Sequence, residues 1–301
     1  MTIQRELMQS PSVARPRALE LAEKIARPVL RLGGFSSTYV PTELGRMHAS
    51  VARGRGSLPP VILLHGLGAA ATNFVPLTLA LQPHVQSIIC IDMPGHGLSA
   101  VTQRSVDLVE MYDALCVCID ALCGMPFSLV GNSLGGAMAL RYASERPKRV
   151  RSLALLSPAG AALSPDVIRR VTAAFDISTP REARAFLKRV YHQPPWYSAL
   201  VAREVLAITR SSSVRSVLAQ AERASAMEPE ELRALAMPVL LWWGESERVL
   251  PLEALEYFQA HLPASAVIER PLKMGHCPHV EAPRRTAARL VSHWRAAALN
   301  K

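Results

Sequence analysis

The chain has 301 residues, half of them apolar, and a formal net charge of +10 at pH 7. This length and apolar content predict a folded globular protein with a large core, built as one or two domains. No uncharged apolar run reaches the roughly 18 residues that a membrane-spanning helix needs, and no apolar signal core occurs near Met1, so we expect neither a membrane span nor a secretory signal.

The positive charge is carried mostly by arginine and does not form a nucleic-acid-binding pattern. The densest basic stretch, residues 146–151, contains no interleaved aromatic residue, and no zinc-finger or RNA-binding signature occurs in the sequence. We therefore expect a solvated basic surface and no nucleic-acid partner. The charge is also compatible with weak attraction to anionic membranes or acidic substrates.

The cysteines indicate a reducing compartment. The five are Cys90, Cys116, Cys118, Cys123 and Cys277. Their number is odd, no Cys-x-x-Cys pair occurs, and four of them fall in apolar segments, as buried reduced thiols do. We expect a cytoplasmic protein. We expect no metal site, because His and Cys residues lack the spacing of metal ligands.

Residues 1–44 are predicted to form a helical N-terminal extension. In the segment 17–27, Leu21 and Ile25 share one face and charged residues occupy another. Such a helix is expected to pack on the core. It is also the candidate surface for weak contact with a membrane or a partner.

Short apolar runs alternate with helical patterns over residues 45–160 and 236–301. The predicted strands are 61–64, 87–91, 127–130, 152–156, 238–243 and 266–269, and the predicted helices are 74–81, 106–122, 137–145, 252–261 and 284–299. This alternation predicts an α/β fold, a mostly parallel central sheet with helices on both faces. Residues 161–235 are helical throughout. We interpret them as a helical cap inserted above the carboxyl ends of the strands, where open α/β sheets bind ligands.

The motif Gly131-Asn132-Ser133-Leu134-Gly135 joins a predicted strand to a predicted helix. A serine on such a sharp turn holds its hydroxyl exposed, and the two glycines let the backbone pass close on both sides. This arrangement presents a weak nucleophile to a carbonyl carbon. Ser133 is therefore the predicted nucleophile.

A serine that attacks a carbonyl also needs a base and an orienting acid. His276 lies in the loop between the last predicted strand and the final helix and is the predicted base, with His279 as the alternative. Glu247 follows an apolar strand closely and is the predicted orienting acid, with Glu245 as the alternative.

Two backbone N–H groups are expected to form an oxyanion hole. That of Leu134 lies at a helix N-terminus, where the helix dipole favours developing negative charge, and that of Leu67 lies in the loop after the first core strand. The candidate residues of the substrate pocket are Gly66, Phe175, Trp196 and Tyr197. Packing within the cap is the alternative for each aromatic residue.

Several ordered motifs resemble those of the α/β-hydrolase fold family. They are His65-Gly66, Asp92-x-Pro94-Gly95-His96-Gly97-x-Ser99, Gly131-x-Ser133-x-Gly135, Gly244-x-x-Glu247-x-x-x-Pro251 and Gly275-His276-x-Pro278. The resemblance covers about residues 45–300. It implies a Ser133–His276–Glu247 triad that acts through an acyl-enzyme without a cofactor or metal. It also implies that Asp92 and His96 shape a loop, whereas an aspartate is usual where Glu247 stands.

The leading interpretation is a hydrolase of carboxylic esters with an apolar acyl part. One alternative is a carbon–carbon bond hydrolase of ring-opened aromatic products, which residues 131–136 and 156–160 resemble. Residues 67–69 and Cys277 depart from the usual oxyanion loop and aromatic residue of that subfamily. A second alternative is a non-catalytic ligand-binding member of the fold, which the intact serine and histidine disfavour.

Overall fold

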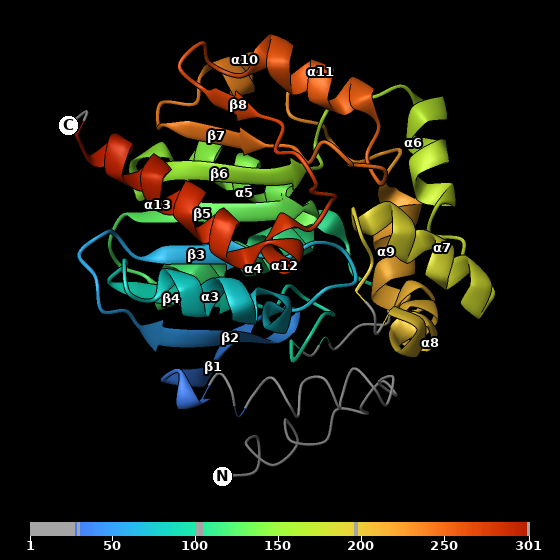
Figure 1. Ribbon diagram of the computed structural model, residues 1–301, viewed down its shortest axis with the longest axis horizontal. Helices are drawn as coiled ribbons and strands as arrows, with labels where there is room; N and C mark the ends of the chain where they lie inside the picture. Colours follow the sequence, from blue (N-terminus) through green and yellow to red (C-terminus); the bar gives the residue numbers. More distant parts are fainter. Residues whose placement is uncertain (1–27, 29–30, 100, 102–104, 196–197, 300–301) are drawn as a thin grey trace.

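The computed structural model describes residues 28, 31–99, 101, 105–195 and 198–299. Its centre is an eight-stranded sheet of order β1-β2-β4-β3-β5-β6-β7-β8 (Figure 1). β1 and β2 pair antiparallel with each other, and β2 pairs antiparallel with β4, whereas all strands from β3 to β8 run parallel. This topology confirms the predicted α/β fold with a mostly parallel sheet.

The elements of the core follow the predicted alternation. The strands are β1 (Phe35–Thr42), β2 (Gly45–Arg53), β3 (Val61–Leu64), β4 (Ser87–Ile91), β5 (Phe127–Ser133), β6 (Val150–Pro158), β7 (Val239–Trp242) and β8 (Val267–Glu269). The helices are η1 (Ala71–Phe74), α3 (Val75–Leu81), α4 (Leu108–Leu122), α5 (Leu134–Glu145), η2 (Pro147–Arg149), α6 (Pro165–Ala173), α7 (Pro180–Val190), α8 (Ser198–Thr209), α9 (Ser212–Gln220), α10 (Pro229–Arg233), α11 (Leu252–His261), α12 (Pro278–Glu281) and α13 (Pro283–Leu299). Each predicted core strand and helix is present within a few residues of its expected bounds.

The first two strands, β1 and β2, are not among the strands predicted from the sequence. Residues 35–42, predicted as the end of a helical extension over residues 1–44, form the edge strand β1, so this part of the prediction is wrong. The segment is rich in Ser, Thr and aromatic or β-branched residues and lacks the apolar spacing of a helix, which favours a strand. The helix predicted at 17–27 lies outside the described residues.

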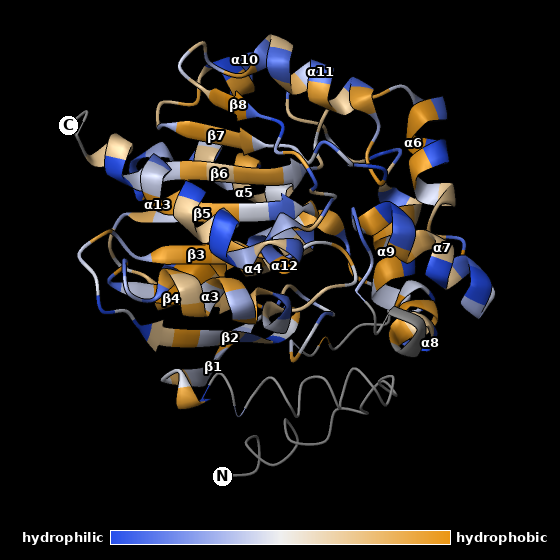
Figure 2. Cartoon of the chain, viewed as in Figure 1, coloured by the Kyte–Doolittle hydropathy of each residue, from blue (hydrophilic) through white to orange (hydrophobic). Residues whose placement is uncertain are grey.

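The parallel strands are buried on both faces, which explains their continuous apolar sequences. Along β3, Ile62 and Leu64 face the layer of α4, α5 and α11, whereas Val61 and Leu63 face the layer of α3 and α13. This alternation follows from the two-residue period of a strand. Figure 2 shows β3 and β7 hydrophobic along their length, between the two helical layers.

Helices α6 to α9 lie beyond the carboxyl ends of the strands (Figure 1). Two side chains of α9 attach this group to the core, because Ser216 Oγ and Gln220 Nε2 donate to the carbonyl oxygen of Val106 at 2.8 and 2.9 Å. All elements described within residues 161–235 are helices. We therefore propose that α6 to α9 form a cap over the sheet, inserted in the core of 45–160 and 236–301. The predicted cap of residues 161–235 extends too far, because α10 packs against α5 and α11 and buries Leu232 in the main core cluster.

Asp92, just after β4, ties three segments of this end of the sheet together. Its buried carboxylate accepts the N–H of Ala71 at 2.6 Å and that of Leu98 at 3.0 Å, and lies 2.8 Å from His48 Nδ1. Burial alone raises the pKa of Asp92, but the hydrogen bonds of His48 and of the Ala71 N–H help to bring it below its usual value. The carboxylate thus shapes the loops around the sheet end, as the family resemblance implies.

We predict that Asp92→Asn lowers the free energy of unfolding by about 3 kcal/mol, since it removes the charge that its buried partners require. Urea denaturation at pH 7 measures this change. The control is Asp176→Asn, which breaks an exposed 2.6 Å ion pair with Arg215 and is expected to cost less than about 1 kcal/mol. Equal effects of the two substitutions would contradict the prediction.

The same carboxylate predicts a pH dependence of stability. Because the folded-state pKa of Asp92 is below its usual value, its contribution is fully present above the unfolded-state pKa. It is lost as the pH falls through the folded-state pKa. The stability difference between the wild-type protein and Asp92→Asn should therefore shrink in acid. A stability difference that grows as the pH falls would contradict this prediction.

Candidate active site

Ser133 occupies the junction where β5 passes directly into α5. Its backbone has φ +54° and ψ −119°, a conformation that residues other than glycine rarely adopt. A Cβ atom at Gly131 would lie 2.2 Å from the carbonyl oxygen of Gly135, and one at Gly135 would lie 2.3 Å from that of Leu64. Glycine is therefore required on both sides of the serine, and the turn holds Ser133 partly exposed at the sheet end.

The loop after β3 lies against the nucleophile. A Cβ atom at Gly66 would lie 3.2 Å from Ser133 Cβ, so the predicted pocket residue Gly66 adjoins the serine. His65 fixes this loop, since its Nδ1 lies 2.8 Å from the carbonyl oxygen of Gly66 and its Nε2 accepts the N–H of Met93 at 3.0 Å. Burial lowers the pKa of His65, which favours the neutral ring in this structural role.

The proposed oxyanion donors belong to the two segments that adjoin Ser133, the start of α5 and the loop after β3. Leu134 is the first residue of α5, where an N–H has no partner within the helix. Leu67 follows Gly66 in the loop and is partly buried. These positions agree with the expectation that the two N–H groups face a substrate oxygen, which stays a prediction.

The structure brings the predicted acid and base into direct contact. Glu247 Oε2 lies 2.7 Å from His276 Nδ1, and its other oxygen accepts the N–H groups of Val249 and Leu250 at 2.7 and 3.0 Å. The Glu247 side chain is only 2% exposed. Burial alone raises the pKa of Glu247, but the charge and hydrogen bond of His276 hold it below its usual value. Glu247 is therefore an anion that orients the ring and leaves Nε2 available to the serine.

Asn132 is a residue of the site that sequence reasoning missed. Its Nδ2 donates to the carbonyl oxygen of His276 at 2.9 Å and to that of Leu156 at 2.8 Å. The side chain next to the nucleophile thus holds the histidine loop against the ends of β5 and β6. A buried amide at the end of an apolar strand is the signal that could have indicated this role.

The alternative residues lie elsewhere. Glu245 is exposed at the surface, and its backbone N–H donates to the carbonyl oxygen of Pro271. The ring of His279 is buried against Phe74, with 4.6 Å between the ring centroids. Burial lowers the pKa of His279 to about 3, so this histidine is unsuited to act as a base near neutral pH.

Of the aromatic pocket candidates, only Phe175 lies within the described residues. Its ring packs on Phe186 with 4.9 Å between the centroids. Phe186 in turn packs on a small apolar cluster of the cap that includes Ile177 and Ala183. Phe175 thus packs within the cap, and its place in the substrate pocket stays a prediction. Trp196 and Tyr197 lie outside the described residues.

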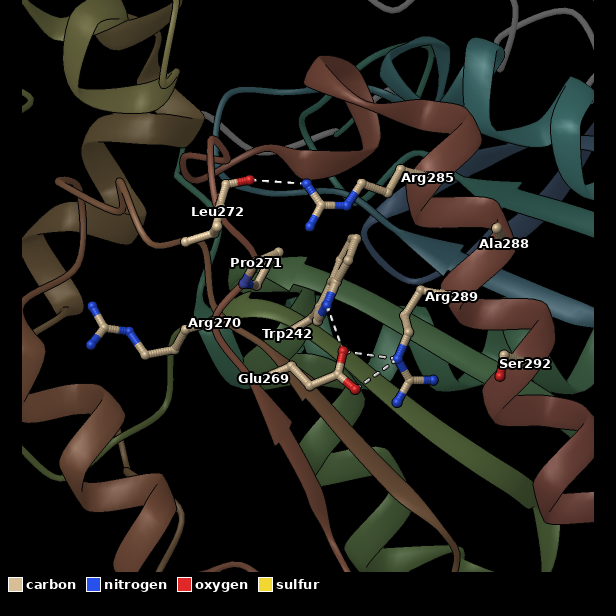
Figure 3. Close-up of a pocket in the computed structure, with 9 residues that line it drawn as sticks. All are labelled: Trp242, Glu269, Arg270, Pro271, Leu272, Arg285, Ala288, Arg289 and Ser292. Carbon is tan, nitrogen blue, oxygen red and sulfur yellow. Dashed lines mark hydrogen bonds and ion pairs between the residues drawn. The ribbon is translucent and has the colours of Figure 1, made fainter.

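A pocket of about 540 Å³ opens between β7, β8 and α13, and no triad residue lines it (Figure 3). Arg289 Nε lies 2.9 and 2.8 Å from the two carboxylate oxygens of Glu269, which also accepts the indole N–H of Trp242 at 3.0 Å. Arg285 donates to the carbonyl oxygen of Leu272. We interpret these contacts as structural links between α13 and the end of the sheet.

Two features are absent from the described residues, a cluster of metal ligands and a membrane-spanning helix. Among these residues, no group of three or more His, Cys, Asp and Glu side chains is placed to hold a metal ion. In the same part of the chain, no helix has the length and apolar content needed to cross a membrane.

Comparison with known proteins identifies the family. A family model for the alpha/beta hydrolase fold matches residues 59–283. The chain therefore belongs to the α/β-hydrolase fold family. A solved membrane phospholipase A, described as a bacterial virulence factor, has the same fold: the TM-score is 0.77 at 24% identity, over 94% of this chain and 92% of that chain.

Several related sequences have named activities. The chain is 30% identical over 251 residues to a pimeloyl-[acyl-carrier protein] methyl ester esterase of Neisseria meningitidis, covering 76% of this chain and 94% of that protein. It is 27% identical over 264 residues to monoacylglycerol lipase ABHD6 of Bos taurus, covering 79% and 76%. It is 28% identical over 198 residues to the dihydrolipoyllysine-residue acetyltransferase component of an acetoin cleaving system of Pseudomonas putida, covering 64% of this chain and about half (53%) of that protein. Fold and relatives together identify a hydrolase of the ester type.

We predict that Glu247→Gln lowers kcat by about 10³- to 10⁴-fold, because the amide no longer stabilises the imidazolium or fixes its tautomer. Steady-state hydrolysis of a p-nitrophenyl ester measures the loss. Glu245→Gln is the matched control, since it changes the same group two residues away on the surface, and its kcat should stay within about twofold. A large loss in Glu245→Gln with little in Glu247→Gln would reverse the assignment.

Proposed function

We propose that the protein is a serine hydrolase that cleaves carboxylic esters with an apolar acyl part. The contact between Glu247 and His276 is the observation that carries this proposal. A buried carboxylate paired with a histidine, at the end of the sheet that also holds the strained Ser133, is the arrangement that activates a serine hydroxyl.

The proposed reaction passes through an acyl-enzyme. His276 Nε2 takes the proton of Ser133 as its oxygen attacks the ester carbonyl carbon, and the N–H groups of Leu67 and Leu134 stabilise the oxyanion. The imidazolium then gives its proton to the departing alcohol. In the second half, His276 takes a proton from water, which attacks the acyl carbon, and the proton returns to Ser133 as the acid leaves. Glu247 stays ionised throughout.

The preference for apolar acyl groups is supported by what surrounds the loop of the oxyanion hole. A Cβ atom at Gly68 would lie 2.7 Å from Ile208 and 3.7 Å from Val214, both on the cap. Leu67 and Leu134 pack against the apolar core cluster. The esterase and lipase relatives also support this chemistry by their names. We propose a small-molecule ester as the substrate.

We also propose that the protein is cytoplasmic. All of its cysteines are free thiols, and four of them are buried, as in proteins of reducing compartments.

The proposal is tested by hydrolysis of p-nitrophenyl esters from acetate to palmitate. We expect turnover by the wild-type protein and a loss of at least about 10³-fold in Ser133→Ala, because the nucleophile is removed. Ser292→Ala, an exposed serine in the pocket of Figure 3, should leave kcat unchanged. The chain length with the highest kcat/KM reports the size of the acyl site.

Three other results would contradict the proposed ester hydrolase. Turnover of a vinylogous 1,5-diketone acid without turnover of any ester would favour the carbon–carbon bond hydrolase. Failure of the wild-type protein on all of these substrates would favour the ligand-binding alternative. Undiminished ester hydrolysis by Ser133→Ala would contradict the serine mechanism.

A further inference from the structure

Three segments from distant parts of the chain meet behind His276. They are the end of α7 with the residues after it (190–193), the loop that carries the acid (244–248) and the loop that carries the histidine (274–276). The N–H of His276 donates to the carbonyl oxygen of Val190 at 2.8 Å. The cap therefore bonds directly to the backbone of the predicted base.

The backbones of these segments touch without intervening side chains. A Cβ atom at Gly275 would lie 2.6 Å from the carbonyl oxygen of Val190 and 2.8 Å from the nitrogen of His192. One at Gly244 would lie 2.3 Å from the carbonyl oxygen of Gly275. The segments 190–193 and 244–248 therefore fix the position of the histidine loop, because neither backbone contact leaves space for the loop to shift.

Glu281, at the end of the short helix α12, joins two of these segments. Its Oε2 accepts the N–H of Gly275 at 2.6 Å, and its Oε1 accepts the N–H of His192. Burial raises the pKa of the half-buried Glu281, opposed by its bonds to Gly275, His192 and the N–H of Gln193. Each carboxylate oxygen thus serves a different segment, and an amide would turn one acceptor into a donor facing an N–H group.

Side-chain contacts extend the connection to the acid loop. His192 Nδ1 lies 2.7 Å from Ser246 Oγ, and Arg248 donates to the carbonyl oxygen of Lys188 in α7 at 2.8 Å. The end of α7 is thereby attached to both loops that hold the acid and the base. The proposed reaction uses none of these groups.

We propose that Glu281 is a positioning residue that locks the end of cap helix α7 to the histidine loop, so that the orientation of His276 depends on the place of the cap. This inference rests on the proposed function for its effect on catalysis. The lock itself is a property of the fold. Its loss should impair the chemical step more than substrate binding, because the histidine moves while the pocket walls remain.

Hydrogen–deuterium exchange of the full chain tests the lock without any substrate. In Glu281→Gln, the amides of residues 190–193 and 274–276 should both exchange at least about tenfold faster than in the wild-type protein. One N–H then faces the NH₂ group instead of an acceptor, and the other keeps only a neutral carbonyl oxygen in place of the carboxylate. Glu182→Gln is the matched control. Its carboxylate accepts the N–H groups of Ser178 and Thr179 at 2.7 and 3.1 Å at the other end of α7, so only that end should loosen.

Unchanged exchange in Glu281→Gln, or faster exchange in one segment alone, would overturn the lock. Should Glu281→Gln fail to fold, Glu281→Asp carries the same test, since it keeps the charge and shortens the reach. The two segments should then again exchange faster together.

Kinetics test the effect on catalysis. With the p-nitrophenyl ester best hydrolysed by the wild-type protein, kcat of Glu281→Gln should fall about tenfold or more with KM within about twofold. Glu182→Gln should retain its kcat. Loosened segments with unchanged kcat, or a raised KM alone, would overturn the positioning role. If no ester is turned over, the proposed function fails. The exchange experiment still shows whether Glu281 holds the end of α7 and the histidine loop together.

Discussion

The close approach of backbones around Ser133 is the constraint on which the site depends. Strand β5 turns into α5 without a connecting loop, so Gly131 and Gly135 touch neighbouring backbone and leave no room for a side chain. The serine takes a conformation that costs of order 1–3 kcal/mol. The buried parallel strands supply the rigidity that maintains it. The result is a hydroxyl fixed at the carboxyl end of the sheet, beside the loop after β3.

Two buried carboxylates hold the loops and the histidine ring near Ser133 in place. Asp92 holds the loops at the end of β4, and Glu247 holds the ring of His276. Both carboxylates are buried, and in both a histidine and backbone N–H groups offset the cost of burial. Glu281 is only half-buried, and it accepts one backbone N–H from the cap and one from the histidine loop. Three carboxylates thus set the positions of the loops, and one of them faces the proposed chemistry.

Much of this could be predicted from the sequence because its signals are local. Ser133 and the parallel strands follow from short motifs and continuous apolar runs. Strand β1 could not be predicted in this way, since an edge strand half exposed to solvent has no such run. The roles of Asn132 and Glu281 were also missed, because Asn132 bonds to His276, 144 residues away in sequence, and Glu281 bonds to His192, 89 residues away. Only the fold brings these polar groups to the backbone that they hold.

That Ser133 is a nucleophile activated by His276 is tested most directly by reacting the full chain with a fluorophosphonate probe and mapping the adduct by peptide mass spectrometry. We expect a single adduct on Ser133, absent in Ser133→Ala. It should form at least about 10²-fold more slowly in His276→Gln, where the base is removed. An adduct on another residue, or an undiminished rate in His276→Gln, would contradict the triad.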